Sequence, residues 1–220
     1  MIAYMNDAVA LYLRELIDWE SYFGWRRGEG FDLDAERAAL TEVIETAAQI
    51  CAEIEPSSRA AWEQEAQLEQ GRVTPPSHIR AAYEKLAAAG LISFGVREEY
   101  GGFELPSFVA NVILQMVARA DAGLMTMVGL QAGIAEDIQL YASDELKQRY
   151  LPRFASGEVM GAMDLTEPQA GSDLGAITTR DYRFSSRPWD NPLAVDTTCT
   201  LCSKGCSTTA WLKAKPEWAK

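Results

Sequence analysis

Residues 159–175 read VMGAMDLTEPQAGSDLG and mark the point at which the sequence changes character. Residues 159–166 form a short apolar run bounded by Gly and Pro, which favours a β-strand. A Pro-containing turn follows, after which Gly171 and Ser172 offer an unhindered backbone and a hydroxyl. That combination can hold a phosphate without a basic side chain. The same residues also suit an ordinary polar turn after a strand, and spacing alone does not decide between the two.

The sequence before residue 159 has the periodicity of α-helices. Apolar residues recur at three- and four-residue steps over 7–23 and 34–55, which predicts two amphipathic helices, the second closed by Pro56. The polar stretch 63–72 is expected to be a helix end and a loop. Further helices are expected over 74–90, from Pro106 onward, over 123–140 and over 143–155, the last with Ser143 as its N-cap and Gly157 just beyond it.

These elements predict a mainly α-helical fold in three parts. Residues 1–158 should form an N-terminal bundle of helices joined by short connections. Residues 159–180 should contain the first strand of a truncated β-domain. Residues 181–220 are expected to be an irregular, disordered tail of different origin, because the charge and the residue types change there.

The formal net charge of −12 argues against nucleic-acid binding, because a phosphate backbone is held by clustered Lys and Arg. The tail differs from the rest, since 181–220 carry six Lys or Arg against four Asp or Glu and so leave −14 on 1–180. No apolar run is long enough to cross a bilayer, and no basic segment leads into an apolar signal at the N-terminus. A cytoplasmic protein without membrane contacts is therefore expected.

The run 161–175 resembles the signature of the acyl-CoA dehydrogenase family, in which an aliphatic residue, Thr or Ser, Glu and a short turn precede Gly-Ser-Asp. Other stretches follow the order of that family. Residues 98–102 (EEYGG) resemble its acidic-Tyr-Gly-Gly turn, and 143–158 resemble the helix and turn before its flavin-binding strand. The resemblance covers about residues 30–180 and is greatest to the long bacterial members, including those acting on methylthiopropionyl-CoA.

The resemblance implies a flavoprotein oxidoreductase of fatty acid metabolism. The family binds FAD, removes two hydrogens from the α and β carbons of an acyl-CoA thioester and passes electrons to an electron-transfer flavoprotein. By the same resemblance, Met163, Leu165 and Thr166 would lie beside the flavin ring. Gly171 and Ser172 would contact the FAD pyrophosphate, and Ser172 would also touch the thioester ligand.

The family's general base is a carboxylate of a C-terminal helical domain that these 220 residues do not supply. Proton abstraction at the α carbon requires a base within hydrogen-bond reach of that proton. We therefore assign no catalytic residue and expect a truncated dehydrogenase that is inactive alone. A non-catalytic helical fragment is the alternative. Association into a homo-oligomer is left open.

Three of the four cysteines lie in the tail, as Cys199, Cys202 and Cys206. Their spacing, Cys-x2-Cys-x3-Cys, lets three thiolates converge on an iron–sulfur cluster or a Zn ion. The tail resembles the iron–sulfur segment of the large NADH–quinone oxidoreductase subunit, which implies a fusion or a frame change near residue 180. No fourth Cys follows Cys206, so reduced, unliganded thiols are the other interpretation. His78, the single histidine, is expected to be exposed or capping.

Overall fold

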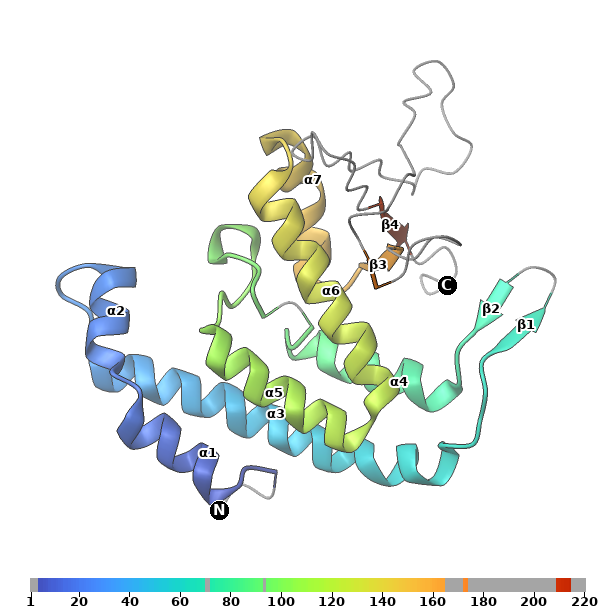
Figure 1. The fold of residues 1–220 in the computed structure, drawn as a ribbon, viewed down its shortest axis with the longest axis horizontal. Helices are drawn as coiled ribbons and strands as arrows, with labels where there is room; N and C mark the ends of the chain where they lie inside the picture. The colour runs from blue at the N-terminus through green and yellow to red at the C-terminus, as the bar shows by residue number, and fades with distance from the viewer. Residues whose placement is uncertain (1–3, 70–71, 93, 165–171, 174–208, 215–220) are drawn as a thin grey trace. The chain divides into compact units, whose positions relative to one another are not determined.

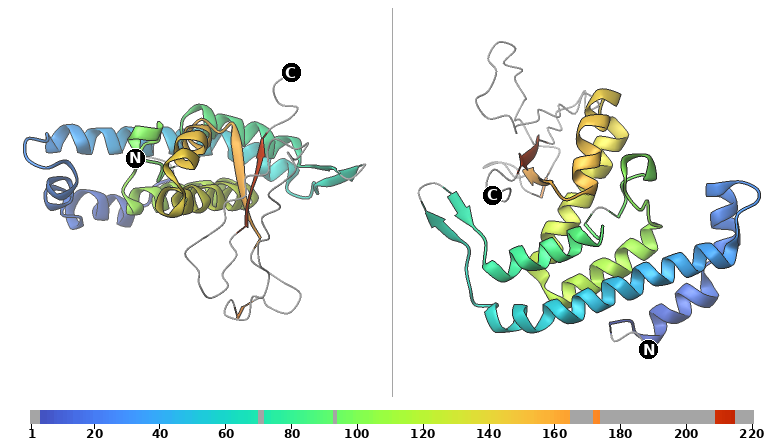
Figure 2. Two further views of the ribbon diagram at one scale, coloured as in Figure 1. Left: turned by 90° about the horizontal axis from the view of Figure 1, so that it is seen from above. Right: turned by 180° about the vertical axis from the view of Figure 1, so that it is seen from behind.

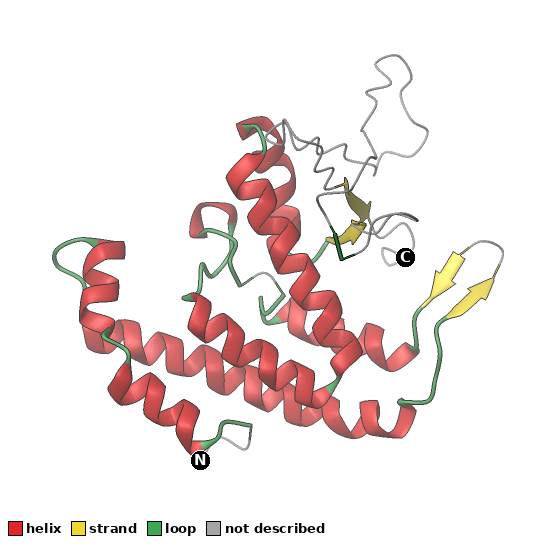
Figure 3. Cartoon of the chain, in the orientation of Figure 1, coloured by secondary structure: helices red, strands yellow, loops and turns green. Residues whose placement is uncertain are grey.

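The computed structural model describes residues 4–69, 72–92, 94–164, 172–173 and 209–214, and helices dominate these ranges (Figure 3). The mainly helical fold is thereby confirmed. The elements before the hairpin and within it are α1 (Asp7–Leu11), the π-helix η1 (Tyr12–Leu16), α2 (Trp19–Arg27), α3 (Leu33–Ala61), β1 (Gln67–Glu69) and β2 (Arg72–Thr74). They are followed by α4 (Ser77–Ala88), the 3-10 helix η2 (Glu98–Tyr100), α5 (Ser107–Ala120), α6 (Ala122–Tyr141), α7 (Asp144–Ala155), β3 (Val159–Asp164) and β4 (Thr209–Ala214).

The chain forms two compact units. The first comprises residues 1–91 and 105–126, and the second comprises residues 92–104 and 127–220. In the first unit α3 lies alongside α5 and also contacts α4 and α2 (Figure 1). The core of this unit is made by the apolar faces of these helices, with Cys51, Tyr83 and Ile113 among its fully buried side chains. Burial of these faces holds the helices together.

Helix α3 runs for 29 residues and passes through Pro56, so the expected end at this proline is wrong. A proline inside a helix removes one backbone hydrogen bond. In α3, two side-chain interactions span Pro56. The hydroxyl of Ser57 donates to the carbonyl of Ile54 at 2.8 Å, and Arg59 pairs with Glu55 across the proline. Asp32 caps the other end by accepting from the amides of Asp34 and Ala35.

The single helix expected over 7–23 is instead two helical segments with a break between them. Ile17 is extended, with φ −89° and ψ 124°, and Asp18 then caps α2 by accepting from the amide of Ser21 at 3.0 Å. The side chain of Trp19, 5% exposed, reaches back and donates its indole N–H to the carbonyl of Leu13 at 2.6 Å. Asp18 therefore starts a new helix as its N-cap, and the single helix predicted from the apolar periodicity does not form.

Residues 67–74, expected as loop, form an antiparallel hairpin in which β1 pairs with β2, Leu68 opposite Val73. The hairpin extends from the neighbouring ends of α3 and α4 (Figure 2). Helix α4 then begins at Ser77 with Pro76 as its N-cap, three residues after the start of the range that the sequence indicated. Among the described residues, no helix is long and apolar enough to cross a membrane.

The second unit is built from most of α6 together with α7, η2 and β3. Its core contains apolar side chains from each of these elements: Val96, Tyr100, Ile134, Ala135, Ile138, Tyr150, Leu151, Phe154 and Val159. Strand β3 falls within the expected strand and pairs antiparallel with β4, Val159 opposite Ala214 and Asp164 opposite Thr209. Strand β4 therefore gives six residues of the tail an extended backbone, whereas the sequence indicated no element there. The division into three parts at 158 and 180 stays a prediction.

Candidate functional site

The sequence places the candidate site at the end of β3 and in the turn that follows it, within the second unit. Met163 lies in β3, where its backbone pairs with Ala210. Ser172 is described and exposed. Leu165, Thr166 and Gly171 lie outside the described residues, so the structure does not test whether these five positions come together.

Helix α7 sets the position at which β3 begins. As expected, Ser143 caps α7 by accepting from the amide of Leu146 at 3.4 Å, and the helix ends before Gly157. Gly157 has φ +72°, the left-handed conformation that glycine adopts without strain, and its amide donates to the carbonyl of Phe154 at 3.1 Å. Arg153 then pairs with Glu158 at 2.8 Å across the turn. The chain thus leaves α7 in a fixed direction, and Val159 is 1% exposed as β3 starts.

Strand β3 lies against α6 at Gly161. A Cβ added at this glycine would stand 2.6 Å from Ile134 Cδ1 and 3.0 Å from Ile134 Cγ2. Real Cβ contacts are longer than this, so the strand can lie this close to α6 only with glycine at the position. The contact fixes how closely β3 lies against α6, just before the chain reaches residue 165.

Two buried amides on α6 tie the unit together, and sequence reasoning did not identify them. Gln139 accepts from the amide of Arg97 at 2.8 Å through Oε1 and donates to the carbonyl of Gly95 at 3.0 Å through Nε2. Gln131 is fully buried, and its Nε2 lies 3.5 Å from the carbonyl of Phe154 at the end of α7. The signal available in the sequence was a glutamine within a mainly apolar helix, since a buried amide must find partners.

The loop held by Gln139 contains the turn expected at residues 98–102. Gly101 has φ +83°, and its amide donates to the carbonyl of Glu98 at 2.9 Å. A Cβ at Gly102 would stand 2.0 Å from the carbonyl oxygen of Val96, so no side chain fits there. Both glycines of the Tyr-Gly-Gly turn are therefore required by backbone geometry.

Among the described residues of this unit, Asp137 has a displaced pKa. It is half-buried on α6, and burial raises the pKa of its carboxyl, with a smaller increase from the negative charge of Glu136. A displaced pKa occurs at structural positions as well as at functional sites, and Asp137 lies on α6, outside the candidate segment 163–172. We therefore assign it no catalytic role.

His78 contradicts its expected exposure. Its side chain is 9% exposed, and Nε2 lies 3.4 Å from Oδ2 of Asp121, which is equally buried. Asp121 also accepts from the amide of Leu124 through Oδ1 at 2.9 Å, so one carboxylate caps the start of α6 and faces α4. Both residues belong to the first unit, and they form a structural connection between helices.

The expected metal site is not tested, because Cys199, Cys202 and Cys206 lie outside the described residues. Within the described part of the chain, no three His, Cys, Asp or Glu side chains are grouped so as to hold a metal ion. The other cysteine, Cys51, is fully buried in α3. Burial raises the pKa of its thiol to about 12.

Comparison with known proteins gives a family match over much of the chain. The family model described as acyl-CoA dehydrogenase, N-terminal domain, matches residues 37–158. The 3-methylmercaptopropionyl-CoA dehydrogenase of Ruegeria pomeroyi is 32% identical over 166 residues, which is 75% of this chain and 28% of that protein. A probable acyl-CoA dehydrogenase of Bacillus subtilis is 41% identical over 104 residues, 46% of this chain and 17% of that protein.

A solved structure shares the fold. Butyryl-CoA dehydrogenase from Megasphaera elsdenii superposes with a TM-score of 0.53 at 19% identity, over 64% of this chain and 35% of that one. The chain thus spans 28% or less of the length of the two curated relatives described above. The matched family region ends at Glu158, where α7 has ended and β3 is about to begin.

Proposed function

The chain belongs to the acyl-CoA dehydrogenase family, and we propose that it forms the N-terminal helical domain and the first flavin-facing strand of a flavin-dependent enzyme that oxidises acyl-CoA thioesters. The observation that carries this proposal is the continuity between the two parts. The family match covers 37–158, strand β3 follows immediately, and the sequence GAMDLTEPQAGSDLG runs through and beyond that strand.

The chemistry of the donor set fits FAD. Ser172 is exposed, so its hydroxyl is open to a ligand, and residues 161–175 contain no Lys or Arg. Backbone N–H groups and a hydroxyl are donors suited to a pyrophosphate. In this proposal Gly171 and Ser172 hold the pyrophosphate, while Met163, Leu165 and Thr166 lie along the flavin ring. When bound, the flavin accepts the two electrons removed from the α and β carbons of the thioester.

The substrate class follows from the same family relationship. The two relatives named above are dehydrogenases of 3-methylmercaptopropionyl-CoA and of an acyl-CoA. An acyl-CoA is therefore the proposed substrate, Ser172 the residue of this chain that reaches its thioester, and an electron-transfer flavoprotein the proposed electron acceptor.

The polypeptide of these 220 residues should not turn over an acyl-CoA by itself. The reaction needs a carboxylate held against the α proton, and none of the proposed flavin-side residues is a carboxylate. We propose that the base belongs to a part of the enzyme beyond the helical domain and β3. The protein described here would then position the flavin and exclude water without performing the proton transfer.

Flavin retention tests the proposal directly. The polypeptide is purified in the presence of FAD, freed of excess cofactor, and examined for the visible absorbance of oxidised flavin. Wild type should retain FAD, and Ser172→Ala and Thr166→Val should each retain less, because each removes one hydrogen-bonding hydroxyl. Ser107→Ala is the matched control, since Ser107 is an exposed serine at the start of α5.

Two outcomes would count against the proposal. Wild type that keeps its helical circular dichroism but no flavin would favour the alternative, a helical module without cofactor. Equal flavin content in wild type, Ser172→Ala and Thr166→Val would remove these residues from the cofactor site. Dye reduction with butyryl-CoA, expected to be absent, would contradict the assignment of the base elsewhere if it occurred.

A further inference from the structure

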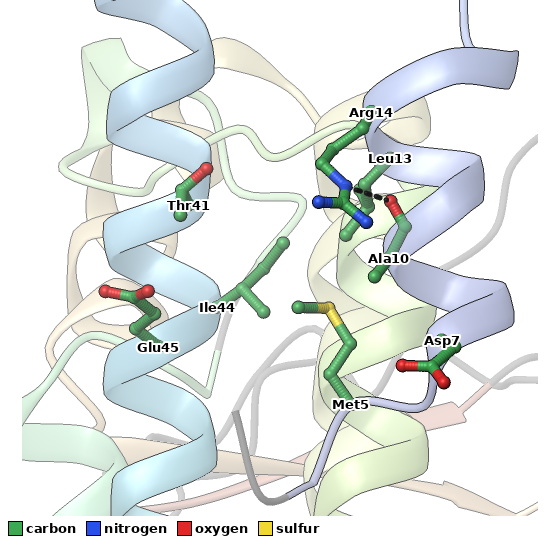
Figure 4. A pocket seen from close by; sticks show the side chains of 8 residues that line it. All are labelled: Met5, Asp7, Ala10, Leu13, Arg14, Thr41, Ile44 and Glu45. Carbon is green, nitrogen blue, oxygen red and sulfur yellow. Dashed lines mark hydrogen bonds between the residues drawn. The ribbon is translucent and has the colours of Figure 1, made fainter. Parts of the chain in front are cut away.

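The first unit contains a cavity far in sequence from the flavin segment. It lies between α1 with η1 on one side and α3 on the other, with a volume of about 400 Å³. Figure 4 shows the side chains that line it: Met5, Asp7, Ala10, Leu13, Arg14, Thr41, Ile44 and Glu45. The volume is within the range of small-molecule sites in proteins.

One wall of the cavity is a π-helix. Such segments are rare and are found frequently at functional sites. This one is held from two sides, because the indole of Trp19 donates to the carbonyl of Leu13 at 2.6 Å and Arg37 donates to the carbonyl of Arg14 at 3.1 Å. These bonds satisfy two carbonyls of the π-helix and fix the residues that line the cavity.

The cavity has an apolar interior and one cationic group at its upper end in Figure 4. Met5, Leu13 and Ile44 point into the space between the helices. Arg14 donates its Nε to the carbonyl of Ala10 at 3.3 Å, which holds the guanidinium at the rim. Within the described part of the chain, its two Nη groups have no hydrogen-bond partner.

The other polar groups restrict the ligand to one anionic end. The hydroxyl of Thr41 already donates to the carbonyl of Arg37 at 2.8 Å, which leaves the guanidinium as the side-chain donor at that end. Asp7 lies about two helical turns from Arg14, at the other end of the cavity. Its negative charge disfavours a second anionic group there. Figure 4 shows Glu45 pointing away from α1.

We propose that this cavity binds a short aliphatic carboxylate, with the carboxylate on the Arg14 guanidinium and the chain on Met5, Leu13 and Ile44. Guanidinium and carboxylate match in geometry and charge, and an unbranched chain suits the apolar walls. The site belongs to the first unit and does not depend on flavin binding.

Calorimetric titration of the 220-residue polypeptide with hexanoate tests this site. Wild type should bind hexanoate saturably and should bind 1-hexanol and hexylamine more weakly. Arg14→Gln should weaken hexanoate binding by about tenfold or more, because a charged hydrogen bond is lost. Ala10→Leu should abolish it by filling the cavity, and Arg149→Gln, which removes an exposed arginine elsewhere, should leave it unchanged.

The proposal fails if hexanoate gives no saturable heat with folded wild type. It also fails if 1-hexanol binds as tightly as hexanoate, or if Arg14→Gln binds like wild type. Circular dichroism and thermal melting of each variant establish that it is folded before titration. Since flavin retention is scored separately, loss of FAD from the polypeptide would not alter the result expected here.

Discussion

Gly161 of β3 and Ile134 of α6 are in direct contact, so close that a Cβ at residue 161 would stand 2.6 Å from Ile134 Cδ1. Ile134 is fully buried, and its neighbours leave it little freedom to turn aside. This contact determines how near the strand that enters the proposed flavin segment approaches the helix. Its strength can be measured without knowledge of the segment beyond β3.

Gly161→Ala should lower the free energy of unfolding by about 1–3 kcal/mol, because the added methyl overpacks the contact with Ile134. Ile134→Val removes Cδ1 and should cost about 0.5–1.5 kcal/mol on its own. The double variant should lose less unfolding free energy than the sum of the two single-variant losses, since the shorter side chain makes room for the methyl. Urea denaturation of the four proteins measures this coupling.

Gly133→Ala is the matched control on the same helix as Ile134. A Cβ there would meet nothing within 4 Å, and no positive φ opposes it. Alanine should therefore stabilise the protein by about 0.4–1 kcal/mol, because it lowers the conformational entropy of the unfolded chain. If Gly161→Ala behaved like Gly133→Ala, β3 would not lie against Ile134 as described.

Gln139→Leu should destabilise the loop that carries the Tyr-Gly-Gly turn. It removes the side-chain partner of the Arg97 amide and of the Gly95 carbonyl, which both belong to exposed residues that water can reach, at a cost of about 0.5–1.5 kcal/mol for each hydrogen bond. Hydrogen exchange at the Arg97 amide should quicken more than exchange in α3. Gln115→Leu, at an exposed position of α5, should change neither quantity.

Local signals in the sequence identified much of the second unit. Ser143 before α7, Gly157 after it and the apolar run from Val159 each act within a few residues, and the structure has all three. These signals suffice because a cap or a left-handed glycine is determined by its own backbone. The strand itself therefore could be predicted, while its contact with Ile134 could not.

Features that depend on distant partners were missed. Pro56 would end a helix in isolation, yet α3 continues through it while packing against other helices. Asp18 is a local exception, because it caps α2 by accepting from the amide of Ser21 three residues later, although the apolar periodicity alone indicated one helix. The partners of Gln139 lie more than forty residues away in the chain, so only the folded structure reveals them.

The interaction between His78 and Asp121 should be measurable by a double-mutant cycle. Asp121→Ala removes both the cap of α6 and the partner of His78, so it should cost about 1–2 kcal/mol, more than His78→Ala. Asp121→Asn keeps an oxygen that can accept from Leu124 and should cost less than Asp121→Ala. The cycle should give a coupling of about 0.5 kcal/mol or more.

The control for this pair is Lys85 and Glu53, which lie 2.8 Å apart and are each about half exposed. An exposed ion pair of this kind contributes about 0–1 kcal/mol. A coupling between His78 and Asp121 no larger than that of the exposed pair, together with equal losses in Asp121→Ala and Asp121→Asn, would contradict the structural role assigned to the carboxylate.

Cys51 should make the protein less stable in alkali. Burial raises the pKa of its thiol to about 12, from an ordinary value of 9.0. Above pH 9 the unfolded chain therefore releases this proton while the folded chain retains it, so the unfolded state binds fewer protons and stability falls as pH rises towards 12. Cys51→Ala lacks the thiol, so its stability should fall less over that range. Tyr4, whose pKa is also raised, is present in both proteins, and Cys51 is the smallest of the causes that raise it, so the difference between their urea midpoints from pH 8 to 11 reports mainly on Cys51.

In native wild type at pH 8, iodoacetamide should leave Cys51 unmodified and should modify it only after unfolding, because the reactive thiolate is scarce and buried. Parallel pH profiles, or rapid native alkylation of Cys51, would show that α3 does not enclose the thiol.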